Sequence, residues 1–250
     1  MSPSSGGIVI LGGGGAMGAE TARLLTEVGH QVLLAGRSEG PLKTASACAA
    51  NCPYEVVDAT QSAEVDACVQ NAAQRFGGLS GAINFVGSFA LKPLHLCADE
   101  DFEHDWATNV KSALYLTRAA VRAMTQKPKG GSIVLMSSVA ARHGMPNHES
   151  IATAKGGVLG LTLSAAATYA ADNVRINAIA PGLIETKLTQ SITENPAMAQ
   201  ASANMHPLRR LGTPQDVARM AQFLLDPAND FITGQVFGVD GGLATLRPKR

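Results

Sequence analysis

The stretch "GIVILGGGGAMGAETARLL", residues 7–25, joins an apolar run to an amphipathic segment through four consecutive glycines. The run has the length and composition of a buried β-strand, and the segment after the glycines has the pattern of a helix. Glycines in a strand-to-helix turn let the backbone approach a pyrophosphate, whose charge is attracted by the first amides of the helix. The stretch therefore predicts a dinucleotide-binding turn, and a purely structural turn is the alternative.

The same alternation of apolar runs and amphipathic segments continues along the chain, without an internal repeat or a linker. Continuously apolar strands, each followed by a helix, indicate a parallel sheet that helices cover on both faces. The sequence thus predicts an α/β protein with a single-domain Rossmann fold over residues 1–250, built on a doubly wound parallel sheet of about seven strands. Helices are expected over 16–28, 40–50, 62–76, 101–126, 150–171 and 214–225, with a polar loop before the last of them.

The composition limits the classes of function. The 250 residues include 20 basic and 20 acidic side chains, so their balance gives no electrostatic reason to expect nucleic acid or an anionic membrane as a partner. We expect a small-molecule substrate instead. Neither a signal peptide nor an apolar run long enough to cross a membrane is recognisable, which favours a soluble, cytoplasmic protein. Cys48 and Cys52 could share a helix face as metal ligands, but no nearby His or Cys pair completes a tetrahedral set, so no metal site is expected.

Six further motifs follow in a fixed order, and together they carry a resemblance. They are "VVDAT" (56–60), "NFVG" (84–87), "ATNVKSALYL" (107–116), "SSVAARHGMPNHESIATAKGG" (137–157), "APGLIETKL" (180–188) and "ITGQVFGVDGG" (232–242). With these motifs the chain resembles the short-chain dehydrogenase/reductase family from Gly7 to about Thr245. The family's phosphate loop reads T-G-x-x-x-G-x-G. Here Leu11 replaces the Thr and Ala16 the middle Gly, and we expect binding to survive the one added methyl group.

The resemblance implies where a dinucleotide would bind. Asp58, followed by Ala59, would contact adenine; Asn84 and Gly87 would line the cleft; and Lys155 would hold the ribose. The remaining cofactor positions that the resemblance implies are Gly12, Gly14, Gly15, Ala16, Met17 and Gly18 in the phosphate loop, and Pro181, Gly182, Ile184 and Thr186 beside the nicotinamide.

The residues after the second strand bear on the choice of dinucleotide. A carboxylate there hydrogen-bonds an NAD ribose and repels a 2′-phosphate, whereas an arginine favours NADP. This strand ends in "LLAGRS", with Gly36 at the position of the acid, followed by Arg37 and Ser38. The sequence therefore favours NADP(H), with NAD(H) as the alternative cofactor and a solvated loop arginine as the alternative interpretation.

The resemblance also implies an Asn-Ser-Tyr-Lys catalytic group. In that group the serine polarises the substrate carbonyl, the tyrosine transfers the proton, and the lysine holds the ribose and lowers the tyrosine pKa. Asn109, which would hold a water linked to the lysine, Ser138 and Lys155 match it. The tyrosine position, thirteen residues after Ser138 and four before Lys155, is occupied by Ile151. The usual proton transfer therefore cannot operate unchanged.

Three interpretations of this exchange remain open. First, the proton could come from His148, which shares a helix face with Ile151 if the helix has already begun there, or less directly from His143. Second, water or the substrate itself could supply it. Third, the protein is a non-catalytic NADP(H)-binding subunit or sensor, which needs Lys155 only to grip ribose. The joint presence of Asn109, Ser138 and Lys155 favours an oxidoreductase.

Two expectations rest on the resemblance alone. The segment from about 187 to 210, rich in Ala and Met, is where family members place a mobile substrate lid. A homo-oligomer, specifically a tetramer, is expected through the helices at 101–126 and 150–171 and the C-terminal strand.

Overall fold

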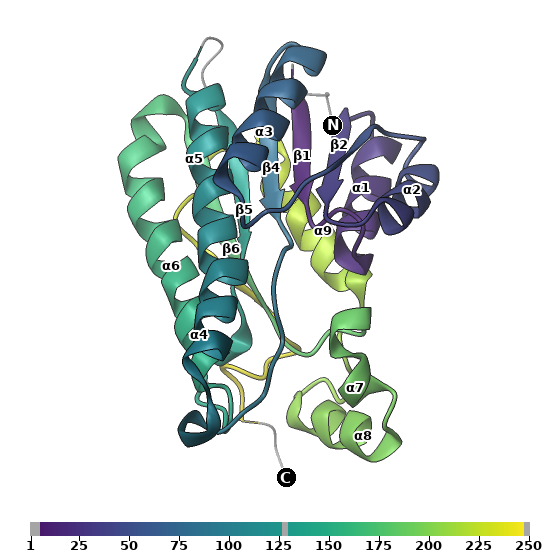
Figure 1. Cartoon of the computed structure of the whole chain (residues 1–250), viewed down its shortest axis with the longest axis vertical. Helices are drawn as coiled ribbons and strands as arrows, with labels where there is room; N and C mark the ends of the chain where they lie inside the picture. Colours follow the sequence, from purple (N-terminus) through teal and green to yellow (C-terminus); the bar gives the residue numbers. More distant parts are fainter. Residues whose placement is uncertain (1–5, 127–129, 248–250) are drawn as a thin grey trace.

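The computed structural model describes residues 6–126 and 130–247 and confirms the predicted doubly wound α/β fold (Figure 1). Seven strands form one parallel sheet in the order β3-β2-β1-β4-β5-β6-β7. The strands are β1 (Gly7–Leu11), β2 (Val32–Gly36), β3 (Tyr54–Val56), β4 (Leu79–Asn84), β5 (Gly131–Met136), β6 (Val174–Pro181) and β7 (Val236–Val239). Residues 1–5, 127–129 and 248–250 of the expected domain lie outside the described residues.

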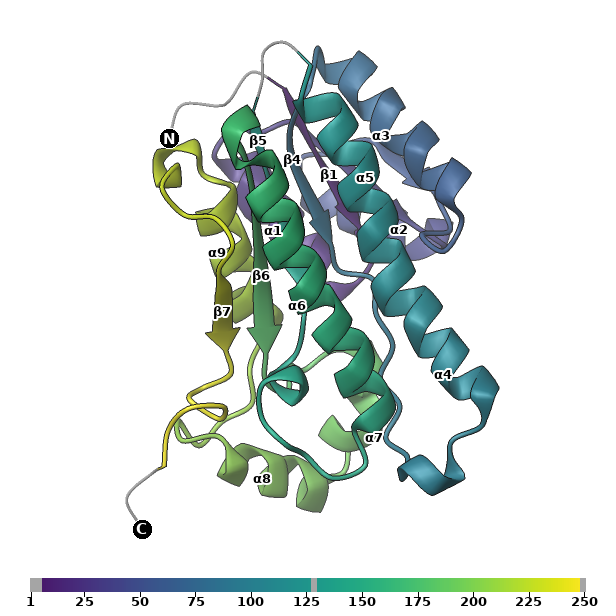
Figure 2. The same cartoon turned by 90° about the vertical axis from the view of Figure 1, so that its left-hand side faces the viewer.

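Helices cover both faces of this sheet (Figures 1 and 2). One face carries α1 (Ala16–Glu27), α2 (Glu39–Cys48) and α9 (Pro214–Leu225), and the other carries α3 (Ser62–Phe76), α5 (Ser112–Met124) and α6 (Glu149–Tyr169). The shorter helical segments are η1 (Leu94–Leu96), α4 (Asp99–Asp105), η2 (Trp106–Lys111), η3 (Val139–Ala141), η4 (Ala170–Asp172), η5 (Lys187–Thr189), α7 (Gln190–Thr193), α8 (Pro196–Met205) and η6 (Pro227–Asn229).

The two-sided burial of β1 explains why its sequence is apolar without alternation. Ile8 and Ile10 belong to the apolar core under α1, α2 and α9, whereas Val9 and Leu11 belong to the core under α3, α5 and α6. Burying one such side chain contributes about 1.5 to 3 kcal/mol, so a polar residue at either set of positions would weaken one of the two layers. The continuous apolar run is therefore what a central parallel strand requires.

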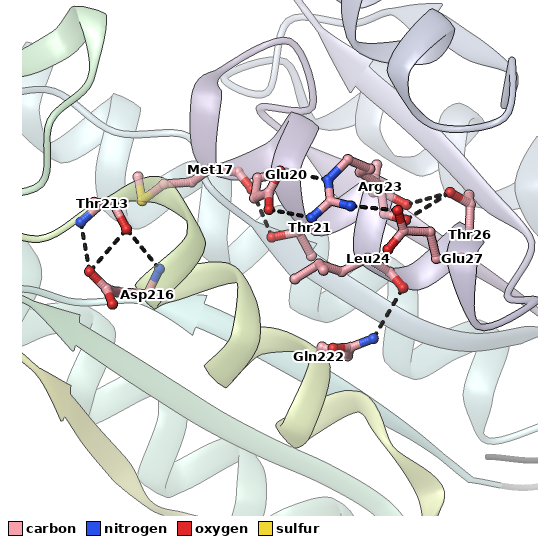
Figure 3. A network of polar contacts seen from close by, with 11 residues as sticks. Met17, Glu20, Thr21, Arg23, Leu24, Thr26, Glu27, Thr213, Asp216 and Gln222 are labelled. Atoms are coloured by element: carbon pink, nitrogen blue, oxygen red, sulfur yellow. Dashed lines mark hydrogen bonds and ion pairs between the residues drawn. The ribbon is translucent and has the colours of Figure 1, made fainter.

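The order of the strands creates a crevice beside β1. From β1 the chain proceeds outward to β2 and β3, then returns to the other side of β1 as β4. The connections leaving β1 and β4 therefore diverge from neighbouring strand ends, at Leu11 and Asn84, and ligands of open α/β sheets bind in such a crevice. Helix α1, which starts there, is fixed to α9 by the Gln222 side-chain amide, which donates to the Leu24 carbonyl at 3.1 Å (Figure 3).

Three expectations from the sequence need correction. The single helix expected at 101–126 is α4 and α5 joined by the π-helical η2, where the Asn109 side-chain amide donates at 2.8 Å to the Asp105 carbonyl that an α-helix reserves for a backbone amide. The polar loop expected before α9 contains α7 and α8. Cys48 ends α2, so Cys52 lies beyond that helix and the two thiols share no helix face.

Within residues 6–126 and 130–247, no helix combines the length and the apolar character needed to cross a membrane.

Candidate active site

The turn after β1 is packed so closely that it requires glycine. Gly12 has φ +76°, and a Cβ there would lie 2.9 Å from the carbonyl carbon of Phe85. A Cβ on Gly18 would lie 2.5 Å from the Gly12 carbonyl oxygen, so α1 packs against the turn without space for a side chain. A tight strand-to-helix turn and a close approach of the following helix are the features that fit a dinucleotide pyrophosphate.

The start of α1 is open to an anion. Gly15 is the N-cap, no side chain caps the helix, and the first turn carries no acidic residue. The helix N-terminus therefore keeps unneutralised amides and the positive end of its dipole. Ala16 is exposed at the first helical position, and Gly14 and Met17 lie beside it on the same turn, so the methyl group at the departure from the family pattern points away from the packed interior.

The residues expected at the adenosine end lie after β2 and β3. Arg37 and Ser38 are exposed, and a Cβ on Gly36 would come no closer than 3.6 Å to another atom, the Leu42 Cδ2. Asp58 Oδ1 accepts hydrogen bonds from the Thr60 amide and hydroxyl, which hold the pKa of this carboxyl below its usual value, and the Arg37 charge acts in the same direction. Ala59 is buried behind it. An arginine and an ionised carboxylate thus face this end of the crevice.

Asn84 holds the turn that carries Gly87. Its Nδ2 donates to Ser112 Oγ at 2.9 Å, and its Oδ1 accepts from the Val86 amide at 3.0 Å. Because these bonds use both ends of its side chain, Asn84 fixes the backbone that leads from β4 to Gly87 at the floor of the crevice.

Lys155, Asn109 and Gly87 meet at one point. Lys155 lies on α6 with 7% of its surface exposed, and its Nζ donates to the Met136 carbonyl at the end of β5 at 2.9 Å. A Cβ on Gly87 would lie 3.1 Å from Asn109 Oδ1 and 3.3 Å from Lys155 Nζ. Burial lowers the pKa of Lys155 to about 8, and the nearby charge of Asp105 opposes that shift.

Ser138 follows β5 and has a proton to offer. Its Oγ accepts from the Ala140 amide at 3.1 Å, and the described residues provide no acceptor for its hydroxyl hydrogen. The neighbouring Ser137 donates to the backbone carbonyl of Lys155 at 3.0 Å, which ties the end of β5 to α6. The structure therefore presents a hydroxyl donor and the Lys155 amine from adjoining segments.

Ile151 lies one helical turn before Lys155 on α6 and is buried, with 4% of its surface exposed. His148 lies just outside that helix: α6 begins at Glu149 and His148 is its N-cap, so helical geometry does not place it on one face with Ile151. Its Nδ1 lies 2.7 Å from the Pro146 carbonyl oxygen, which can only accept, so Nδ1 is the donor of that hydrogen bond.

The segment after β6 crosses the same edge of the sheet. Pro181 ends β6, Gly182 donates its amide to the Val239 carbonyl at 3.0 Å, and Ile184 is buried. Thr186 is the N-cap of η5, which leads into α7 and α8, and Figure 2 shows α8 beyond the carboxyl ends of β6 and β7. The positions expected beside the nicotinamide therefore form the start of the expected lid.

His206 anchors the far end of that segment and was not expected from the sequence. Its Nε2 accepts from the Leu183 amide at 3.3 Å, and its Nδ1 lies 2.7 Å from the Ser202 carbonyl. A Cβ on Gly182 would come within 2.5 Å of its ring. Its place between "NM" and "PL" in the sequence gives no sign of this contact.

Three polar residues behind Lys155 were also not expected. Asp105 has 2% of its surface exposed, and its carboxylate accepts hydrogen bonds from the hydroxyls of Ser88 and Ser150. Ser88 also accepts from Asn109 Nδ2 at 2.7 Å. The one sequence signal is the spacing of Asp105 and Asn109, four residues apart on a helix.

Fold and geometry together define a doubly wound α/β protein whose site lies at the crossover beside β1. A family model described as Enoyl-(Acyl carrier protein) reductase matches residues 14–244. The chain is 34% identical over 242 residues to a 2,5-dichloro-2,5-cyclohexadiene-1,4-diol dehydrogenase of Sphingobium indicum, covering 96% of this chain and 97% of that protein. The chain belongs to the short-chain dehydrogenase/reductase family.

Solved structures agree with this assignment. A short-chain type dehydrogenase/reductase from Mycobacterium ulcerans superposes with a TM-score of 0.92 at 33% identity, over 99% of this chain and 93% of that one. ElxO, solved with NADP bound, superposes with a TM-score of 0.90 at 28% identity, over 97% of this chain and 100% of that one. The likeness extends across the whole described fold.

Proposed function

We propose that the protein is an NADP(H)-dependent oxidoreductase of a small carbonyl or alcohol substrate, with a modified active site that lacks the usual tyrosine. The observation that supports it most is the meeting of Lys155 Nζ, Asn109 Oδ1 and Gly87 beside the glycine turn. A protein that only held a dinucleotide would have no need for the free hydroxyl proton of Ser138. The named relative acts on a small diol, which is consistent with a small substrate here.

Each group of the chain has a distinct part in this proposal. The amides around Gly12 and at the start of α1 bind the pyrophosphate. Lys155 would donate to the ribose hydroxyls, and Ser138 would donate a hydrogen bond to the substrate oxygen and stabilise the negative charge that develops there, while the proton comes from His148, water or the substrate. Ile151 supplies an apolar wall and no proton. The nicotinamide, when bound, supplies or accepts the hydride.

The second candidate function is a non-catalytic NADP(H)-binding subunit or sensor. It is favoured by one observation, that the buried side chain at position 151 has no titratable group. The two functions separate in one assay: NADPH binding is measured by fluorescence, and NADPH oxidation is then followed against a panel of small aldehydes and ketones. Firm binding without turnover of any carbonyl, and without oxidation of any alcohol by NADP, favours the sensor.

The lid, the assembly and the location belong to the same proposal. We assign residues 187–210 as the substrate lid, anchored by His206. The protein acts in the cytoplasm as a homotetramer, without nucleic acid or membrane as partner. Exposed apolar side chains on the α4–α5 and α6 surfaces support the assembly, namely Phe102, Trp106, Leu114 and Leu163.

Light scattering at micromolar concentration should give the tetramer mass, and a monomer mass would contradict the assembly.

NADPH should bind more tightly than NADH because Arg37 can meet the 2′-phosphate. A charge-assisted contact contributes on the order of 1.5 to 3 kcal/mol, so Arg37→Ala should weaken NADPH binding by roughly tenfold to a hundredfold and leave NADH binding nearly unchanged. The matched variant is Gly36→Asp, which the space at Gly36 admits and which should reverse the preference. Fluorescence titration measures the NADPH and NADH affinities of the wild type and of both variants. Full NADPH affinity in Arg37→Ala would refute the assignment.

Carbonyl reduction by the wild-type protein should be slow, because loss of a general acid forfeits about 10² to 10⁴ in rate. Ile151→Tyr should therefore raise kcat on simple aldehydes or ketones and leave NADPH affinity within a small factor of the wild type. Stopped-flow NADPH oxidation gives both values. Rapid wild-type turnover that Ile151→Tyr does not raise would show that the missing phenol does not limit the reaction.

His148→Ala tests the histidine as the proton source. Most of the wild-type activity should disappear in this variant if His148 donates the proton, and the activity should stay unchanged if water or the substrate does. The same NADPH oxidation assay distinguishes these results, and unchanged NADPH affinity is the control for an intact fold.

A further inference from the structure

A buried cluster of polar side chains lies behind Lys155, where α4, the π-helical η2 and the start of α6 meet. It consists of Asp105, Ser88, Asn109 and Ser150, and we call it the Asp105 cluster. The Asp105 side chain has 2% of its surface exposed, and its two carboxylate oxygens accept from different serines, Oδ1 from Ser88 and Oδ2 from Ser150, the latter at 2.7 Å. Both carboxylate oxygens therefore have a hydrogen-bond donor within the protein interior.

The carboxylate and the backbone carbonyl of Asp105 are both acceptors, and together they order the hydrogen bonds of the cluster. Because the Ser88 hydroxyl gives its proton to the carboxylate, its oxygen is left to accept, and it accepts from Asn109 Nδ2 at 2.7 Å. The Asn109 amide therefore has its Nδ2 toward the carboxylate and its Oδ1 on the other side. The Ser88 amide, at 3.3 Å from Oδ1, agrees with that orientation.

The Asn109 oxygen and the Lys155 amine both lie beside Gly87. Asn109 Oδ1 and Lys155 Nζ lie 3.1 and 3.3 Å from one point, the position of a Cβ on Gly87. The cluster thus runs from a carboxylate through a hydroxyl and an amide to a carbonyl oxygen beside the ammonium. The Asp105 backbone carbonyl, which accepts from Asn109 Nδ2 at 2.8 Å, holds the amide in the same orientation as the carboxylate does.

Lys155 needs an anion that this site otherwise lacks. Its Nζ has one described protein acceptor, the neutral Met136 carbonyl, and it is buried against an aliphatic residue at position 151. Among the described residues, Asp105 is the charged group that acts on Lys155, and it stabilises the charged form while burial destabilises it. Glu103 and Asp101 share α4 with Asp105. Glu103 is exposed, so water screens its charge, and Asp101 is half-buried and forms an ion pair with Lys92.

We infer that Asp105 is the counter-ion of Lys155 and a positioning residue of this site: its buried carboxylate keeps the amine protonated, and its hydrogen bond with Ser88 helps to hold Asn109 near that amine. Asp105 thereby compensates for Ile151, whose aliphatic side chain offers Lys155 neither a hydrogen-bond acceptor nor a charge. The inference concerns the charge of Lys155 and rests on the proposed function only where NADPH is the probe.

The direct test is the titration of the Lys155 side chain by NMR, in protein with isotopically labelled lysine and with Lys155→Met to assign the signal. The wild-type midpoint should lie near pH 8. Asp105→Asn, which keeps the size of the side chain and removes its charge, should lower that midpoint by about 1 pH unit or more. Glu103→Gln removes an exposed charge from the same helix and should leave the midpoint unchanged.

NADPH affinity as a function of pH gives a second readout. The Lys155 ammonium is lost as pH rises through its pKa, so wild-type affinity should fall above about pH 8. In Asp105→Asn the fall should begin about 1 pH unit lower, which makes binding roughly threefold weaker at pH 7.5. A purely structural role for Asp105 would lower the affinity equally at every pH.

The outcomes are distinct. A Lys155 midpoint in Asp105→Asn within a few tenths of a pH unit of the wild type overturns the inference, as does an equal shift in Glu103→Gln. If Asp105→Asn does not fold, Asp105→Ser is the second neutral variant, and the same midpoints apply. If the wild type fails to bind NADPH, the proposed function is wrong, and the NMR midpoints still decide whether Asp105 is the counter-ion.

Discussion

The buried amine of Lys155 is the group on which the rest of the site depends. An ammonium withdrawn from water is costly, so the protein surrounds it with groups from several segments: the Met136 carbonyl at the end of β5, Asn109 in the π-helical turn and the charge of Asp105. Ser137 fixes the Lys155 backbone to the same strand end. These contacts require β4 and β5 to end together beside α6, and the parallel sheet provides that arrangement. The amine thereby lies at the edge of the crevice beside β1.

In this arrangement the side chain at position 151 affects proton transfer but not dinucleotide binding. The glycine turn, the open start of α1 and Lys155 are all present, and none of them depends on a group at position 151. An aliphatic side chain there gives the lysine neither a hydrogen-bond partner nor a proton to relay, which is why a buried carboxylate elsewhere acquires importance. In the proposed site, the aliphatic residue at position 151 thus gives weight to Asp105, which lies on a different helix.

The fold could be predicted because its signals are local. The glycine turn at 12–18 and the continuously apolar strands determine a parallel sheet with helices on both faces. The π-helical turn could not be predicted, because it involves a side-chain hydrogen bond from Asn109 to the Asp105 carbonyl that no apolar pattern indicates. Helix α8 has no buried residue, so its sequence lacks an amphipathic pattern. The Asp105 cluster joins positions 88, 105, 109 and 150, and only the packing of α4 against α6 shows that these polar residues are interior.

We propose above all that the protonated amine of Lys155 binds the dinucleotide in this site. Isothermal titration of NADPH at pH 7 into the wild type and into Lys155→Met tests it directly, because methionine fills a similar volume without the charge or its hydrogen bonds. The account predicts binding at least about tenfold weaker in Lys155→Met, from the loss of a charge-assisted contact, with an unchanged circular dichroism spectrum. Equal NADPH affinity in the two proteins would contradict it.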